Sequence, residues 1–147
     1  MEPPLSCTAG VLSCNIARMT NLADLITLAG ETNEKNGYNG YAVADEAGYG
    51  VEYLAKKDLL EVGELAEALE ELRHGHAPDE VYHSGNDEKP EGYLIEKLDA
   101  IIRAFGTIYE VSQRHGIPVS EIENLLVGKI GYNARRADTA TSGVKAF

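Results

Sequence analysis

Two long segments with apolar residues at helical spacing constrain this fold more than any other feature of the chain. From Lys56 to His74 a Val or Leu recurs every three or four residues, and Gly75 follows as a helix-ending residue. The segment from Tyr93 to His115 repeats the pattern. The two apolar stripes are Val62, Leu65, Leu69 and Leu72, and Ile95, Leu98, Ile102, Phe105 and Tyr109. The pattern predicts two long amphipathic helices that pack antiparallel through these stripes.

Two further helices flank this pair. Residues 21–34 carry Leu and Ile at helical spacing and end before an Asn-Gly stop signal. Near the other end of the chain, Ser120 and Glu123 form a capping-box pattern that opens a fourth helix. Gly128 and Gly131 blur the end of that helix. The chain is therefore expected to contain four main helices.

The segments between these helices are expected to be loops. Residues 36–55 hold four glycines and four tyrosines, and residues 75–92 are polar and rich in turn-forming residues. No strand-like alternation and no internal repeat competes with the helical pattern. The predicted class is all-α, a small four-helix-type bundle completed by oligomerisation. Its single domain covers residues 21–147, after a flexible lead-in at residues 1–20.

Charge and composition exclude several classes of protein. The chain has 24 acidic and 13 basic residues and a net charge of −11, which argues against a nucleic-acid partner. An apolar run of about 18 residues, as a membrane helix needs, is absent from the sequence. The N-terminus lacks the basic region of a secretory signal, and two cysteines cannot form a disulfide framework. We expect a soluble, cytoplasmic protein.

Acidic pairs border both apolar stripes. Glu61 and Glu64 are three residues apart, as are Glu96 and Asp99, so each pair lies on one helix face. If the two helices pack together, these four carboxylates converge, and their mutual repulsion calls for a cation. Carboxylate oxygens without clustered His or Cys favour Mg²⁺ or Mn²⁺ over zinc. The glycines Gly63 and Gly106 could leave room beside the metal and substrate.

Basic residues gather at the opposite end of the chain. Residues 58–99 contain 13 acidic and 3 basic side chains, whereas residues 129–147 contain 4 basic and 1 acidic. If the fourth helix continues, Lys129, Asn133 and Arg136 share one face. The ammonium group of Lys129, the amide of Asn133 and the planar guanidinium of Arg136 suit phosphate binding. Beside an acidic metal site, they predict a polyphosphate substrate.

The ordered set of motifs resembles the MazG-type nucleoside triphosphate pyrophosphohydrolases, which belong to the all-α NTP pyrophosphatase superfamily. The motifs are Glu61-Val62-Gly63-Glu64-Leu65, Lys89-Pro90-Glu91-Gly92, Glu96-Lys97-Leu98-Asp99 and Lys129-x-x-x-Asn133-x-x-Arg136. The chain departs from the family at Leu60, where relatives often carry Glu. It also has Asn36-Gly37-Tyr38 where relatives often show Gly-Trp, and this leaves the base preference open.

The resemblance implies Mg²⁺-dependent hydrolysis of an NTP or dNTP to the monophosphate and pyrophosphate, in nucleotide-pool house-cleaning. Glu61, Glu64, Glu96 and Asp99 would hold the metal. One of these carboxylates could double as the general base, and we choose Glu64 for that role. By the same resemblance, Lys129, Asn133 and Arg136 would contact the phosphates. Relatives form dimers or tetramers, so we expect a homodimer or homotetramer.

One other interpretation of the sequence stays open, and two are disfavoured. The acidic helices could form a non-enzymatic interaction module that binds a basic protein. A di-iron bundle is disfavoured, because only Glu71-x-x-His74 fits its Glu-x-x-His motif. A zinc site at His74, His76 and His83 is disfavoured because these residues fall in an expected loop without Cys.

Overall fold

The computed structural model describes the chain over residues 21–139, with side chains up to Arg135. The expected lead-in at residues 1–20 lies outside this range. The described part is mostly helical, which confirms the all-α class. Its elements are α2 (Leu22–Lys35), α3 (Tyr41–Glu46), α4 (Gly50–Arg73), β1 (Tyr82–Ser84), β2 (Lys89–Glu91), α5 (Tyr93–His115) and α6 (Val119–Thr139). None of the described helices combines the length and apolar character needed to cross a membrane.

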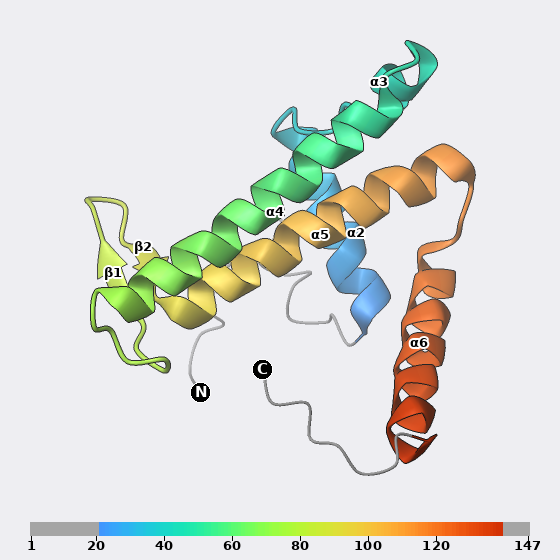
Figure 1. Ribbon diagram of the computed structural model, residues 1–147. Coiled ribbons are helices and arrows are strands. Elements are labelled where there is room, and N and C mark those ends of the chain that lie inside the picture. The colour runs from blue at the N-terminus through green and yellow to red at the C-terminus, as the bar shows by residue number, and fades with distance from the viewer. Residues whose placement is uncertain (1–20, 140–147) are drawn as a thin grey trace, which may run out of the picture.

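Helices α4 and α5 form an antiparallel pair that is the centre of the molecule (Figure 1). Helix α2 packs across α5, and the short helix α3 packs against the ends of both long helices. Helix α6 packs mainly on α2 and descends away from α4 (Figure 1). Helices α2 and α3 thus pack directly on the long pair, and α6 is joined to it mainly through α2.

The expected boundaries of α2 and α5 are confirmed at their capping residues, whereas α6 begins at Val119, before the expected cap Ser120. The side chain of Asn21 accepts the backbone N–H of Asp24 at 2.9 Å, which satisfies one free donor at the start of α2. Helix α5 spans the expected range and ends at Gly116, which adopts the left-handed conformation with φ 65°. Glycine occupies this conformation without the steric penalty of other residues.

Two of the expected loops are wrong in part. Residues 41–46 form α3, and α4 begins at Gly50 rather than Lys56, so most of the expected 36–55 loop is helical. The expected 75–92 loop contains an antiparallel hairpin, in which Tyr82 pairs with Glu91 and Ser84 with Lys89. Strands of three residues are too short for side-chain alternation to be visible in a sequence.

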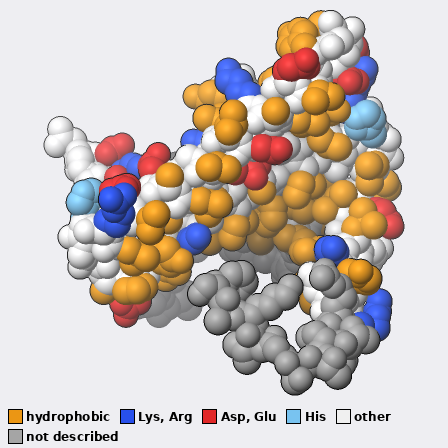
Figure 2. Space-filling model, in the orientation of Figure 1, with side chains coloured by type: hydrophobic (Ala, Val, Ile, Leu, Met, Phe, Trp, Pro, Cys, Tyr) orange, Lys and Arg blue, Asp and Glu red, His pale blue; other side chains and the backbone are white. Residues whose placement is uncertain are grey.

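The expected packing of α4 against α5 through their apolar stripes is also wrong. The α4 stripe, formed by Val62, Leu65, Leu69 and Leu72, is 37–57% exposed. Figure 2 shows hydrophobic side chains along α4 and α5 on the face turned to the viewer. Instead, α4 buries Glu64 and Ala68, and α5 buries Glu96 and Ala100. Small alanines let two helices approach closely, which brings neighbouring carboxylates together.

The apolar core lies between α2 and α5 rather than between the long helices. Ile26 is fully buried and Tyr109 nearly so. A Cβ atom added at Gly30 would lie 2.0 Å from Cγ of Tyr109, so only glycine lets the ring pack this closely. Of the expected α5 stripe, Tyr109 is therefore buried as expected, but against α2, whereas Leu98 and Ile102 are about half exposed.

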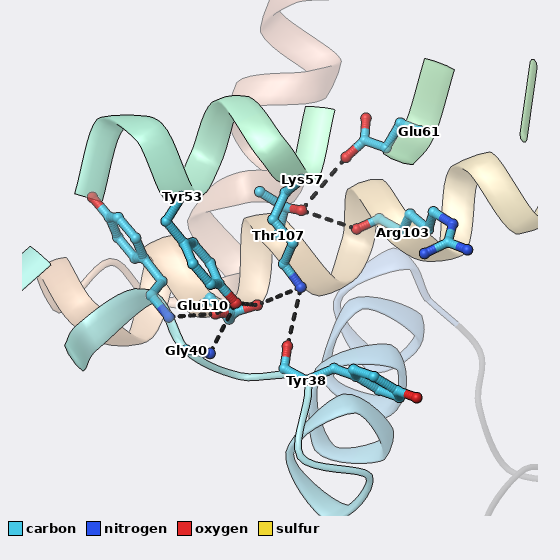
Figure 3. A network of polar contacts seen from close by, with 9 residues as sticks. Tyr38, Gly40, Tyr53, Lys57, Glu61, Arg103, Thr107 and Glu110 are labelled. Carbon is cyan, nitrogen blue, oxygen red and sulfur yellow. Dashed lines mark hydrogen bonds and ion pairs between the residues drawn. The ribbon is translucent and has the colours of Figure 1, made fainter. Parts of the chain in front are cut away.

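A polar network fixes the segment between α2 and α3 to the long helices (Figure 3). The buried Glu110 carboxylate accepts the backbone N–H of Tyr41 at 2.8 Å and the hydroxyl of Tyr53 at 3.0 Å. Lys57 pairs with Glu110 at 2.9 Å and donates to the carbonyl of Tyr38 at 3.0 Å. This network holds the α2–α3 segment near the N-terminal part of α4 and the C-terminal part of α5.

Candidate metal centre

Three carboxylates converge between α4 and α5. Glu64 comes from α4, and Glu96 and Asp99 come from the first half of α5. Each offers one oxygen, and these three oxygens lie within 4.8 Å of one another. Because Glu96 and Asp99 are three residues apart, they share the face of α5 that packs on α4. The arrangement is the one that the acidic pairs predict for these three residues. We call it the acidic triad.

Burial distinguishes the acidic triad from a solvated cluster of acids. Glu96 is 2% exposed and Glu64 is 7% exposed. The Oε2 atom of Glu96 is buried and has no hydrogen-bond partner among the described residues. A buried, unpartnered carboxylate oxygen is costly to desolvate, so it indicates a missing cation or proton. The all-oxygen donor set fits a hard divalent cation such as Mg²⁺ or Mn²⁺.

The protonation of the triad reflects this burial. Burial raises the pKa of Glu96 to about 7, with the nearby Lys89 opposing the shift and the carboxylates of Glu67 and Asp99 adding to it. Burial also raises the pKa of Asp99, and the charge of Glu64 adds to that rise. A raised pKa means that the surroundings disfavour the charged carboxylate, and a nearby positive charge offsets this cost. A divalent cation would supply such a charge.

Arg103 is the cation closest to the triad in this structure. Its Nε and Nη2 atoms both donate to Oε1 of Glu64. The guanidinium side chain is 44% exposed, whereas that of Glu64 is 9% exposed. A half-exposed arginine therefore neutralises a buried triad carboxylate from the solvent side.

The fourth expected ligand, Glu61, lies one turn from the triad on α4 and is not part of it. The Thr107 hydroxyl donates to the carbonyl of Arg103 at 3.1 Å and lies 3.5 Å from Oε1 of Glu61 (Figure 3). Burial raises the pKa of Glu61, and the charge of Asp58 adds to that rise. The structure thus brings three of the four expected carboxylates together and places the fourth beside them.

A cavity of about 560 Å³ adjoins the triad. Glu64, Asp99 and Arg103 form the wall that it shares with the triad. The remaining lining comes from three elements and the segment after α2. It consists of Asn33, Asn36, Tyr38, Lys57, Leu60, Ile102 and Thr107. Polar amides, two cations and an exposed aromatic ring therefore lie beside the carboxylates, and a cavity of this volume is typical of small-molecule sites.

The two glycines expected to make room at the site play different parts. A Cβ atom added at Gly106 would lie 2.1 Å from Nδ2 of Asn33, so this glycine makes space for a cavity-lining amide. A Cβ added at Gly63 would meet nothing within 4 Å. Gly106 thus shapes the cavity, and Gly63 does not.

The expected phosphate-binding residues lie on α6. The helix continues through Gly128 and Gly131, so Lys129 and Asn133 share a face as expected. In the described chain, neither residue lines the cavity beside the triad, and Lys129 lies 5.1 Å from the ring centre of Tyr132. The side chain of Arg136 lies outside the described residues.

Comparison with known proteins gives no independent identification. No family model, curated protein or solved structure matches this chain. The site must therefore be interpreted from its own geometry.

Sequence reasoning did not select Arg103, Lys57 or Asn33. Arg103 follows Asp99 by four residues and so shares its helix face, and this spacing could have identified it. Lys57 and Asn33 reach the cavity only through the packing of α2 and α4 around α5. No spacing rule connects them to the acidic motifs.

Proposed function

We propose that this protein is a divalent-cation-dependent hydrolase that converts a nucleoside triphosphate to its monophosphate and pyrophosphate. The observation that carries the proposal is the unpartnered, buried Oε2 of Glu96 inside a triad of carboxylates that borders a cavity. Buried carboxylates without a counter-ion destabilise a fold, so their presence favours a ligand-binding role.

The residues of the site have distinct roles in this proposal. Glu64, Glu96 and Asp99 hold Mg²⁺ or Mn²⁺, with Glu61 one turn away as a further candidate ligand. The bound cation supplies charge stabilisation at the phosphate oxygens and lowers the pKa of coordinated water. The cavity receives the nucleotide, and its polar lining orients the triphosphate toward the triad.

Hydrolysis at the α-phosphorus forms a bond to the water oxygen and breaks the anhydride bond to the β-phosphate. The β- and γ-phosphates then leave together as pyrophosphate. The water proton needs an acceptor. Glu64 is the sequence-based choice for this acceptor. A carboxylate that coordinates a cation is a weaker base, so Glu64 can serve only through an oxygen that the cation leaves free.

A product analysis tests the proposed reaction. Purified protein with Mg²⁺ is given a panel of canonical and modified NTPs and dNTPs, and pyrophosphate and orthophosphate are measured separately. We expect pyrophosphate as the first product and at least a hundredfold lower rate in Asp99→Asn. Glu70→Gln is a matched control, because Glu70 lies on the exposed surface of α4 and pairs only with Arg73 among described residues.

The outcomes separate the candidate functions. Orthophosphate as the first product would contradict pyrophosphohydrolysis. Full activity in Asp99→Asn would contradict the ligand assignment. If the protein neither binds Mg²⁺ nor releases pyrophosphate, the acidic interaction module becomes the better explanation.

We further propose that the active form is a homodimer in which a second copy covers the α4 stripe. Four large apolar side chains remain about half exposed along three turns of α4, and Leu94, Leu98 and Ile101 of α5 are 45–51% exposed. Stable dimers typically bury roughly 800 Å² per partner with an apolar centre. A second copy presents the same apolar surface, so the contact can be symmetric and self-complementary.

A further inference from the structure

We infer that Arg103 is a cation-responsive phosphate ligand, which neutralises Glu64 when no divalent cation is bound and turns to the substrate phosphates when one binds. This inference rests on the proposed metal-dependent function. It assigns a role to a residue that the acidic and basic motifs of the sequence do not include.

The first observation is that Arg103 and a triad-bound cation would compete for one carboxylate. Both guanidinium contacts go to Oε1 of Glu64, and Glu64 is one of the three residues whose oxygens converge. A divalent ion in the triad would lie within a few ångströms of the guanidinium. Two positive charges this close repel strongly where solvent screening is weak. Cation binding therefore weakens the attraction between Arg103 and Glu64.

The second observation is that the Arg103 side chain has room to reorient. Its side chain is 44% exposed and lines the cavity next to the triad. An arginine side chain reorients at small cost when its tip is not enclosed, and its planar fork matches phosphate oxygens in pairs. Release from Glu64 thus places a guanidinium where the triphosphate would lie.

Lys57, the other cation of the cavity, is held differently. It pairs with the buried Glu110 at 2.9 Å and donates to the carbonyl of Tyr38 at 3.0 Å (Figure 3). Glu110 is outside the acidic triad, so a bound cation does not compete for it. Cation binding is therefore expected to leave the contacts of Lys57 in place and to change the partner of Arg103. Of the two cavity cations, Arg103 alone is coupled to the triad through a shared carboxylate.

Calorimetric titration of Mn²⁺ in the absence of nucleotide tests the first half of the inference. Arg103→Gln removes the competing charge, so we expect Mn²⁺ to bind about threefold to tenfold more tightly than to the wild type. Arg73→Gln is the charge-matched control, because Arg73 lies on the exposed surface of α4 and pairs with Glu70. It should bind Mn²⁺ as the wild type does.

Binding of inorganic tripolyphosphate at saturating Mn²⁺ tests the second half. This probe carries no base, so the result does not depend on the unknown nucleotide. We expect Arg103→Gln to weaken tripolyphosphate binding about tenfold or more, because a charge-assisted contact is lost. If Arg103 had a merely structural role, its replacement would weaken the binding of both ligands. The inference instead requires tighter Mn²⁺ binding and weaker tripolyphosphate binding.

The possible results distinguish failure of this inference from failure of the proposed function. Equal or weaker Mn²⁺ binding in Arg103→Gln, or unchanged tripolyphosphate binding, overturns the inference while the metal site stands. A wild type that binds no Mn²⁺ overturns the proposed function itself. If Arg103→Gln does not fold, Arg103→Lys keeps the charge and loses the fork. That variant must then weaken tripolyphosphate binding with little change for Mn²⁺, and unchanged tripolyphosphate binding would reject the role.

Discussion

Helix α4 presents two neighbouring faces with opposite properties. Its face toward α5 buries a carboxylate, Glu64, and the small Ala68. The adjacent α4 stripe leaves four large apolar side chains about half exposed. In an isolated globular domain the assignment is normally reversed, with apolar residues inside and acids in water. The two proposals above account for this difference, since they assign the buried acids to a cation and the apolar stripe to a second copy of the chain.

The largest expected effect comes from the apolar stripe. We expect Leu65→Asp combined with Leu69→Asp to convert a dimer to a monomer, with the dissociation constant raised more than about a hundredfold. Burying one leucine contributes about 1.5–3 kcal/mol, and a symmetric dimer loses each contact twice. Light scattering after size-exclusion chromatography measures the mass. A wild type that is already monomeric would contradict the proposed dimer.

A substitution in the acidic triad should weaken cation binding and leave the dimer intact. Glu96→Gln removes the most buried charge of the triad, so we expect Mn²⁺ affinity to fall at least about tenfold. The dimer should persist, because Glu96 lies on the face of α5 that packs against α4. Calorimetry and light scattering on the same sample give both values. Loss of the dimer in this variant would show that the two faces are not independent.

The pH dependence of stability sharpens the comparison further. The pKa of Glu96 is about 7 in the folded chain, against an ordinary value of 4.5. A raised carboxyl pKa means that the folded state binds the proton more tightly. Its stabilising contribution is therefore complete below pH 4.5 and is lost as pH rises through 7.

With a chelator present, the free energy of unfolding attributable to Glu96 should fall over this range by at most about 3.5 kcal/mol, because one pKa unit corresponds to about 1.4 kcal/mol. Denaturant titrations at several pH values measure it. In Glu96→Gln, the free energy of unfolding should no longer fall in this way as pH rises. In the wild type, added Mn²⁺ should oppose the fall. An identical slope in the variant would assign the titration to another group.

The smallest expected effect concerns Gly63, on the side of α4 away from both faces. A Cβ atom added there meets no atom within 4 Å. Gly63→Ala should therefore raise the free energy of unfolding by up to about 1 kcal/mol through helix propensity alone. Chemical denaturation measures the gain, and Mn²⁺ affinity should be unchanged. Weaker Mn²⁺ binding would restore the expectation that this glycine makes room at the metal.

Much of the candidate site was predictable because it depends on helical spacing. Glu96 and Asp99 share a face of α5 at any packing, so two of the triad residues follow from their separation of three. The addition of Glu64 also required that α4 turn its Glu64 and Ala68 face toward α5, which the spacing does not fix. Arg103, by contrast, was missed because many solvent-exposed arginines lie four residues from an acid without touching a site.

Local chemistry in the sequence determined where the main helices lie, because caps and apolar periodicity act within a few residues of the chain. Asn21 and Gly116 mark helix ends, and the hairpin between α4 and α5 was missed because its strands are only three residues long. Tertiary structure alone decided which face of α4 is buried. That choice depends on how closely Ala68 and Ala100 let the helices approach, and on partners contributed by distant segments. A helix can bury either an apolar or a polar face if the rest of the molecule supplies what that face requires.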